Sequence, residues 1–268
     1  MLSERQKLGT TRKGSQFQAT SIFLSSLPKL SILISRSLPD IFRHLLAEDS
    51  ETGSTFTQAQ LNSNANLIIV AGSDTTSSTL SQTFGVLARD QRILKKLQEE
   101  INGVCEKGEE LTVETIKNLV YLNGVVNKAL RLLNPIPSGI QATTPTIGVE
   151  VADVHLPGSI QVQVPHIVLM TDERYFPNPE EFIPERWTGE KPQFLLEKRA
   201  FIPFGYGVHS CVGKQLALNE MRLVLARVVR EFDMVMGESY DEERFREEWM
   251  DYMVLKIGAM WVKFVRRG

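Results

Sequence analysis

The sequence predicts an α+β fold that is mainly helical and carries a small β-sheet. Apolar residues recur with helical spacing between about residues 40 and 135, and again in one stretch near the C-terminus. Short stretches with alternating apolar residues lie within 143–170 and at 232–236 and 259–265. The segment 171–210 is rich in proline and glycine, which predicts an extended, coil-rich meander.

The first predicted elements are helices. Helical spacing begins after Asp40, and Thr57 can cap a long helix that we expect to run to about Ala88. Residues 90–102 carry lysine–glutamate pairs four residues apart, which indicate a solvated helix face. The expected inward positions of the long helix are Leu61, Ala65, Ile68, Ile69, Leu80, Phe84 and Leu87.

The remaining elements alternate between helix and strand. Thr112 opens another helical stretch, which prolines at 135 and 137 end. The alternating residues of 143–170 surround Pro157 and Gly158, which predict the turn of a small hairpin or sheet. One clean helix follows Cys211, and two short strands close the chain.

The two ends of the chain differ in organisation. Residues 15–39 contain seven serines, scattered Leu and Ile, and no acidic residue lies between Glu4 and Asp40. Such a segment can bury no consistent face, so we interpret residues 1–39 as irregular or foreign to the fold, with 14–39 a translated intron. Residues 40–268 form the folded region.

The composition is that of an ordinary globular chain. Of its 268 residues, 42% are hydrophobic, and 30 basic residues balance 32 acidic ones. This balance offers no basic field for nucleic acid, so no nucleic-acid partner is expected. Cys105 and Cys211 are too few for a disulfide framework or a structural zinc site. No run of about 18 apolar residues occurs, so we expect no transmembrane anchor in this chain.

The segment 204–213, placed directly before a helix, is the sharpest chemical feature. Its glycines allow the backbone to approach something flat and bulky. Cys211 lies where the dipole and free N–H groups of a helix favour a thiolate. With the basic His209 nearby, this thiolate suits an axial iron ligand beside an anionic cofactor edge. The residues in order are Phe204, Gly205, Tyr206, Gly207, Val208, His209, Ser210, Cys211, Val212 and Gly213.

Two other interpretations of this segment compete. One is an inert cysteine beside a glycine turn. The other is a cysteine-dependent redox or acyl-transfer enzyme using Cys211 and His209, for which the sequence supplies no third, orienting group. A phosphate-binding loop is excluded, because the glycine spacing and the preceding strand do not fit.

A second group of polar residues lies in the middle of the long helix. Gly, Ser, Asp and Thr weaken helix interiors, and a threonine hydroxyl can bond to the carbonyl four residues earlier. The apolar run 67–70 leads into this group, so a carboxylate there is costly unless it has a task or a partner. A kinked core helix with a solvated Asp74 is the alternative. The group comprises Ala71, Gly72, Ser73, Asp74, Thr75 and Thr76.

Together these segments resemble the cytochrome P-450 family of haem-thiolate monooxygenases. The family's cysteine loop reads Phe-Gly-x-Gly-x-(Arg or His)-x-Cys-x-Gly, and every fixed position is present. Its oxygen-activating helix reads (Ala or Gly)-Gly-x-(Asp or Glu)-Thr-(Thr or Ser), which 71–76 match. The resemblance implies haem b with iron bound axially by the Cys211 thiolate, and Asp74 and Thr75 as the catalytic acid and alcohol. It implies that the cofactor contacts Ala71, Gly72, Phe204, Gly205, Gly207, His209 and Gly213.

A third segment supports the resemblance, and one position departs from it. Residues 182–187 resemble the Pro-Glu-Arg-Phe meander of the family. The family's Glu-x-x-Arg helix falls on 128–131, where Lys128 replaces the glutamate. In the family that glutamate pairs with both arginines, so the resemblance implies three buried cations together: Lys128, Arg131 and Arg186.

Members of the family are roughly twice as long as this chain, so the resemblance implies a truncated cytochrome P-450 fold, the C-terminal haem-binding half, of fungal or microsomal type. The implied activity inserts one oxygen atom of O2 into a small, apolar, secondary-metabolite-like organic substrate, with electrons from an NADPH-dependent reductase. It also implies the cytosolic face of the endoplasmic reticulum membrane, and contact of full-length relatives with the membrane surface. The alternative is a non-catalytic fragment that binds haem weakly or not at all, which Lys128 and the missing half favour.

Overall fold

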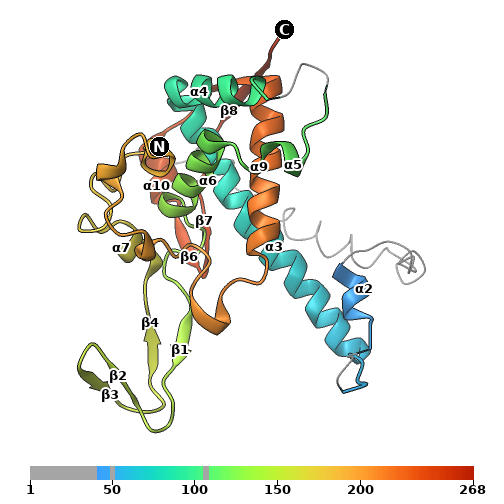
Figure 1. The fold of residues 1–268 in the computed structure, drawn as a ribbon, viewed down its shortest axis with the longest axis vertical. Helices are drawn as coiled ribbons and strands as arrows, with labels where there is room; N and C mark the ends of the chain where they lie inside the picture. The colour runs from blue at the N-terminus through green and yellow to red at the C-terminus, as the bar shows by residue number, and fades with distance from the viewer. Residues whose placement is uncertain (1–40, 49–51, 105–108) are drawn as a thin grey trace, which may run out of the picture. The chain divides into compact units, whose positions relative to one another are not determined.

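A computed structural model describes residues 41–48, 52–104 and 109–268 of the chain. It consists of helices and short strands, which confirms the predicted α+β class (Figure 1). The helices are α2 (Ile41–Leu45), α3 (Gln58–Arg89), α4 (Gln91–Asn102), α5 (Val113–Ile116), α6 (Val120–Leu132), α7 (His166–Met170), α8 (Glu185–Thr188), α9 (Lys214–Glu231) and α10 (Glu242–Glu247). The strands are β1 (Gln141–Thr143), β2 (Val149–Val151), β3 (Val154–Leu156), β4 (Gln161–Gln163), β5 (Phe232–Met236), β6 (Met250–Tyr252), β7 (Val254–Lys256) and β8 (Val262–Arg266).

The chain forms two compact units, residues 1–67 and 68–268. The described part of the first unit contains α2 and the start of α3. The second unit holds the hydrophobic core and all the predicted site residues. The predicted segment 1–39 lies outside the described residues. Within the described part, no helix is long and apolar enough to span a membrane.

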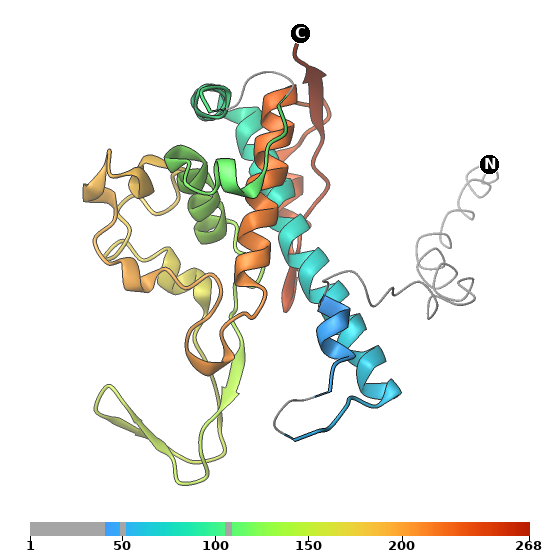
Figure 2. The ribbon, with the colours of Figure 1, turned by 45° about the vertical axis from the view of Figure 1, so that its right-hand side comes forward.

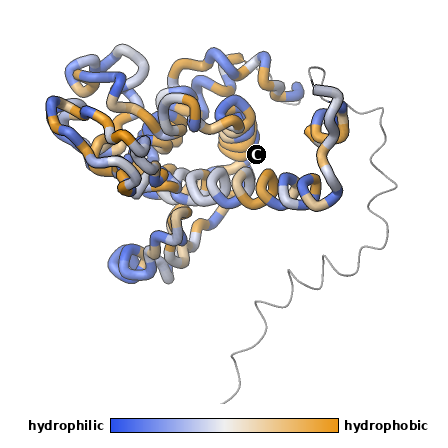
Figure 3. Tube along the Cα trace, turned by 90° about the horizontal axis from the view of Figure 1, so that it is seen from below, coloured by the Kyte–Doolittle hydropathy of each residue, from blue (hydrophilic) through white to orange (hydrophobic). Residues whose placement is uncertain are grey.

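The long helix α3 begins and ends close to where the sequence predicts. Thr57 caps its start, because the Gln60 amide donates to the Thr57 hydroxyl at 3.4 Å and the Gln60 side chain accepts from the Thr57 amide at 2.9 Å. The helix passes through the polar group 71–76 without a break. Figure 3 shows hydrophobic and more polar turns alternating along it. The prediction that Ile69 points inward with the other apolar residues of this helix is wrong, because Ile69 is exposed. Within α3, the buried residues begin only at Thr76.

The core lies among α4, α5, α6 and α9, which pack side by side, and the C-terminal half of α3 contributes Leu80, Leu87 and Ala88 to it (Figures 1 and 2). Interpreting 90–102 as only a solvated face is wrong, because α4 also buries an apolar stripe. Asp90 caps this helix by accepting from the amides of Arg92 and Ile93. The buried residues of α4 include Ile93, Leu94, Leu97 and Ile101.

Two charged side chains of α4, Lys96 and Glu100, form hydrogen bonds with residues of other elements. The Lys96 ammonium donates to the Glu190 carboxylate at 2.7 Å. The Glu100 carboxylate accepts from the amides of Tyr121 and Leu122, at 2.7 Å each. Since Leu119 provides no side-chain cap, Glu100 of α4 satisfies the first amides of α6.

Four two-stranded antiparallel pairs make up the sheet structure: β1–β4, β2–β3, β5–β8 and β6–β7. The predicted hairpin is present, but its turn is not at Pro157–Gly158. Val151 pairs with Val154, and Ala152 and Asp153 between them have φ of 49° and 63°. Two successive positive φ values form the turn that matches the twist of a two-residue hairpin. Asp153 tolerates this conformation, whereas the sequence signal of Pro-Gly marks the later corner before β4.

Candidate functional site

The cysteine loop is closed by its own backbone. The Cys211 amide donates to the Phe204 carbonyl at 2.8 Å, and the Ser210 amide donates to the Gly207 carbonyl at 3.1 Å. Gly205 and Gly207 have φ of 72° and 79°, which side chains with a Cβ rarely adopt. The first two glycines of the motif are therefore required by the turn that presents Cys211.

Cys211 lies three residues before the first residue of α9. The Lys214 amide donates to the Cys211 carbonyl at 3.4 Å, and a Cβ built on Gly213 would lie 3.7 Å from the Cys211 sulfur. The thiol is exposed and is bonded to no other cysteine among the residues that the structure describes. His209 ends the short 3-10 turn η4 (Gly207–His209) and is also exposed. The loop thus presents a thiol beside a helix start, as predicted, while its role as an iron ligand stays a prediction.

Large apolar side chains around Cys211 are exposed in the part of the chain that the structure describes. Val208 and Val212, which flank the cysteine in sequence, are 95% and 103% exposed. Tyr206 and Leu216 are also exposed. Single exposed apolar residues are common, whereas here four lie within eleven positions around one thiol.

The polar group of α3 is the second predicted part of the site. The Thr75 hydroxyl donates to the Ala71 carbonyl at 2.8 Å, the back-bond that its position predicts. The Asp74 carboxylate is exposed and accepts from the Ser73 hydroxyl at 3.2 Å. Gly72 is exposed, and an added Cβ would meet nothing within 4 Å. This face of α3 is open, and exposed Ile69 precedes it.

The end of α6 connects these two parts. The Thr79 hydroxyl of α3 donates to the Leu133 carbonyl at 3.4 Å. The side-chain amide of the next residue, Asn134, donates to the Pro203 carbonyl at 3.5 Å, just before the cysteine loop. Its oxygen accepts from the Ile136 amide at 2.7 Å. Sequence reasoning missed buried Asn134, although an asparagine directly before Pro135 is a turn signal.

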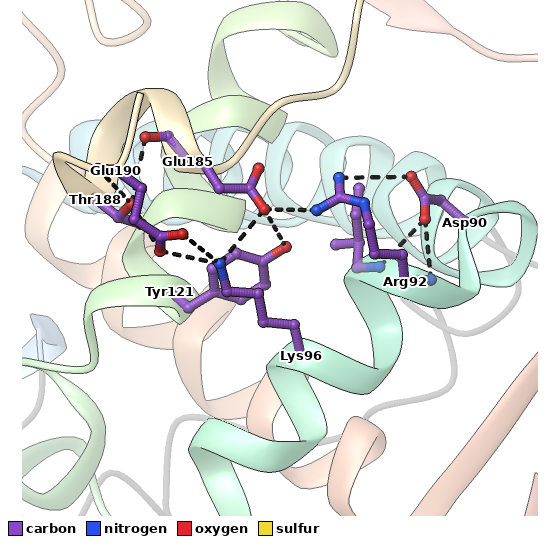
Figure 4. A network of polar contacts seen from close by, with 8 residues as sticks. Asp90, Arg92, Lys96, Tyr121, Glu185, Thr188 and Glu190 are labelled. Carbon is purple, nitrogen blue, oxygen red and sulfur yellow. Dashed lines mark hydrogen bonds and ion pairs between the residues drawn. The ribbon is translucent and has the colours of Figure 1, made fainter. Parts of the chain in front are cut away.

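The meander carries a second feature that the sequence did not indicate. Glu185 is 3% exposed and accepts from the Arg92 guanidinium at 2.5 Å (Figure 4). The Lys96 ammonium lies 3.5 Å from the same oxygen, and the Tyr121 hydroxyl donates to it at 3.4 Å. Burial opposes ionisation of Glu185, but its backbone hydrogen bond and the Arg92 guanidinium outweigh burial and lower its pKa. Burial raises the pKa of the Tyr121 hydroxyl.

Lys128, Arg131 and Arg186 lie together, as the resemblance implied, and we call them the cation cluster. Their exposed fractions are 0%, 0% and 1%. Burial first, and then the charges of Arg131 and Arg186, lower the pKa of the Lys128 ammonium well below its ordinary value. Burial and the charge of Arg186 lower the pKa of the Arg131 guanidinium. The replacement of the family glutamate by Lys128 thus buries three cations together, as predicted.

Comparison with known proteins identifies the family. The sequence profile of the Cytochrome P-450 family matches residues 26–262. Cytochrome P-450 monooxygenase orf5 of Eupenicillium brefeldianum is 35% identical, and the alignment covers 85% of this chain and 46% of that protein. Cytochrome P-450 monooxygenase aclL of Aspergillus oryzae is 36% identical, over 79% of this chain and 43% of that protein.

Two further relatives agree with this result. Tryprostatin B 6-hydroxylase of Neosartorya fischeri is 35% identical, over 86% of this chain and 42% of that protein. The crystal structure of a cytochrome P-450 haem domain shares the fold, with a TM-score of 0.72 and 24% identity, over 83% of this chain and 48% of that one. The chain spans less than half the length of the curated relatives named here. With the glycine-flanked Cys211 loop and the polar group of α3 both in place, the chain belongs to the cytochrome P-450 family.

Proposed function

We propose that this chain is the haem-binding part of a monooxygenase that inserts one oxygen atom of O2 into a small, apolar organic molecule. The observation that carries the proposal is Cys211, presented at a helix start by a glycine turn and surrounded by apolar side chains without protein partners. The monooxygenase names of the relatives support the same class of activity.

The residues of the loop fit a haem b group. A flat apolar ring can cover Val208, Val212 and Tyr206, which lack any other covering surface. Cys211 would bind the haem iron in this proposal, and exposed His209 would be available to pair with a propionate. Phe204 and the glycines at 205, 207 and 213 shape the loop around the ring. Ala71 and Gly72 would contact the group from α3, where Gly72 leaves open space.

Haem iron, when bound, supplies the oxidation chemistry, while the chain holds the group and delivers protons. In this proposal the Asp74 carboxyl and the Thr75 hydroxyl would hold and donate the protons that the oxidation consumes. The Thr75 hydroxyl already has an acceptor, the Ala71 carbonyl, so it can rotate between that oxygen and a reacting one. The exposed apolar residue Ile69 favours an apolar organic substrate.

We also propose partners and a location from the family. The electron donor is an NADPH-dependent reductase, and the site of action is the cytosolic face of the endoplasmic reticulum membrane, where full-length relatives contact the membrane surface. Among the relatives, one is named a tryprostatin B hydroxylase, and we propose a secondary-metabolite-like substrate class for this chain.

A non-catalytic fragment that binds haem weakly is the second candidate. The buried cation cluster favours it, because three desolvated positive charges weaken the meander that packs on α6. The two candidates differ in whether haem binds through a thiolate.

A reduced carbon monoxide difference spectrum of the haem-reconstituted chain tests the proposal. We expect a thiolate-type Soret band, which Cys211→Ala abolishes and Cys105→Ala leaves unchanged. Equal spectra for the two variants would refute Cys211 as the ligand, and absence of any haem band in the parent chain would favour the non-catalytic candidate.

A further inference from the structure

The cation cluster has the composition of an anion site. Lys128 and Arg131 are one turn apart on α6, and Arg186 comes from α8 across the α6–α8 contact. All three are at least 99% buried. A buried charge is costly unless an opposite charge accompanies it. The question is what supplies the negative charge.

The hydrogen bonds of the three side chains are made to backbone carbonyl groups. The Lys128 ammonium donates to the Pro179 oxygen at 3.3 Å, and the Arg131 guanidinium donates to the same oxygen and to that of Met170. The Arg186 guanidinium donates to the Asn178 oxygen at 3.0 Å and to the Phe194 oxygen. The three cations therefore converge on two successive carbonyl groups, which carry only partial charge.

Glu181 is the acid whose charge acts on the cluster, but its carboxylate forms a hydrogen bond with a residue outside the cluster. Glu181 is exposed, and its carboxylate accepts from the Asn178 side chain at 3.0 Å. It raises the pKa of Lys128 less than burial and the two arginines lower it. Glu185, the neighbour of Arg186 in sequence, binds Arg92 of α4 instead. Neither carboxylate neutralises the cluster.

Two buried donors of the cluster have no partner. The Nε atoms of Arg131 and Arg186 are inaccessible and make no hydrogen bond within the described part of the chain. An unpaired N–H of a buried guanidinium is among the costliest polar groups to leave unsatisfied. The cluster thus combines excess positive charge with free, charged donors.

We propose that the cation cluster binds one small monovalent inorganic anion, such as chloride, between Lys128, Arg131 and Arg186. The anion supplies the charge that the backbone carbonyl groups lack, and it accepts from the unpartnered Nε donors. It ties α6 to the meander, a structural role that is separate from the proposed oxidation chemistry.

A cavity lies beside one neighbour of the cluster. The Lys128 ammonium lies 6.0 Å from the centre of the Phe182 ring. Phe182 also lines a cavity of about 760 Å³, together with Glu181 and Ile183. Phe182 thus lies near the Lys128 ammonium and also lines the cavity.

Thermal unfolding of the full chain in chloride and gluconate tests the proposal. Chloride replaces gluconate stepwise at constant ionic strength, so general screening stays constant. We expect a saturable rise of the melting temperature, of about 2–6 °C. In Lys128→Glu, whose own carboxylate occupies the cluster, the melting temperature should not depend on chloride. No chloride effect in the parent chain, or an equal effect in Lys128→Glu, would overturn the proposal.

Bromide locates the ion directly. Crystals grown in bromide should give an anomalous peak in contact with the Arg131 and Arg186 guanidinium groups, and crystals of Lys128→Glu should lack it. A peak elsewhere, with the cluster empty, would overturn the proposal even if chloride stabilises the chain. Haem loading enters neither measurement, so failure of the proposed function leaves this test intact.

Discussion

Lys128 and Arg131 donate to the same acceptor, the carbonyl oxygen of Pro179. Two cations on one turn of α6 thus hold a single point of the meander. A carbonyl oxygen that receives two charged donors polarises strongly, but it cannot neutralise them. The contact between α6 and the meander is therefore well defined in geometry and poor in electrostatic compensation.

Lys128→Glu should stabilise the chain. The substitution removes one desolvated positive charge and gives Arg131 and Arg186 a carboxylate partner, so we expect the free energy of unfolding to rise by about 3 kcal/mol. Chemical denaturation in gluconate measures the change. Lys95→Glu, the same charge change at an exposed position of α4, is the control and should alter stability by less than about 0.5 kcal/mol. Equal effects of the two variants would show that the cluster does not govern stability.

Stability should rise with pH when no small anion is present. The pKa of Lys128 is lower in the folded chain than in the unfolded chain, so the folded chain binds this proton more weakly and increasing pH favours the folded chain. The slope for one proton reaches about 1.4 kcal/mol per pH unit below the unfolded pKa of about 10.4. The charged groups that act on Lys128 are Arg131, Arg186 and Glu181.

Denaturation between about pH 7 and pH 9.5 in gluconate measures this slope. Chloride should flatten it, because an anion in the cluster favours the protonated ammonium. Lys128→Met is the control variant and should lack the slope in either salt. A parent chain with the same pH profile as Lys128→Met would contradict the expectation.

Glu185→Gln should destabilise the chain through loss of the network in Figure 4. The buried carboxylate joins α8 to α4 through Arg92 and Lys96, so we expect a loss of about 1–3 kcal/mol. Glu190→Gln, in the exposed pair with Lys96, should cost about 0–1 kcal/mol. Because ionisation of Glu185 is favoured in the folded chain, its contribution is present above the unfolded pKa and is lost as pH falls through the lowered folded pKa. Equal losses in both variants would argue against a special role of burial at Glu185.

Thr75→Ala should separate substrate binding from coupling in a full-length relative that carries this helix sequence. The hydroxyl is proposed to deliver protons, so its loss should divert reducing equivalents to peroxide while substrate affinity stays within about twofold. Ser77→Ala is the control, since its hydroxyl donates to the Asp74 carbonyl at 3.3 Å on the same helix. Peroxide and product yields measure the outcome, and unchanged coupling would exclude the role.

Local signals in the sequence predicted much of the fold and the site. The bounds of α3 followed from Thr57 and from helical spacing, which depend on neighbouring residues alone. The Gly205 and Gly207 turns were predictable because only particular φ values allow the loop to close on Cys211. The cation cluster followed from a single substitution, Lys128, once the family pattern was recognised.

Contacts between distant segments were not predictable from such signals. The i and i+4 spacing suggested that Lys96 and Glu100 belong to one solvated face, yet both act on residues of other elements. Glu185 was assigned to the meander motif, whereas its position beside Arg92 depends on how α4 and α8 pack. The turn at Ala152–Asp153 was missed, because alanine rarely adopts positive φ and the Pro-Gly signal nearby was stronger.

The Glu100 carboxylate at the start of α6 has a consequence for how the chain opens. The amides of Tyr121 and Leu122 have their acceptor only while α4 is docked, because the acceptor belongs to another helix. Displacement of α4 therefore exposes the first turn of α6, and we expect the amides of this turn to exchange together with those of α4. In this part of the fold, the first turn of α6 is complete only when the contact with α4 has formed.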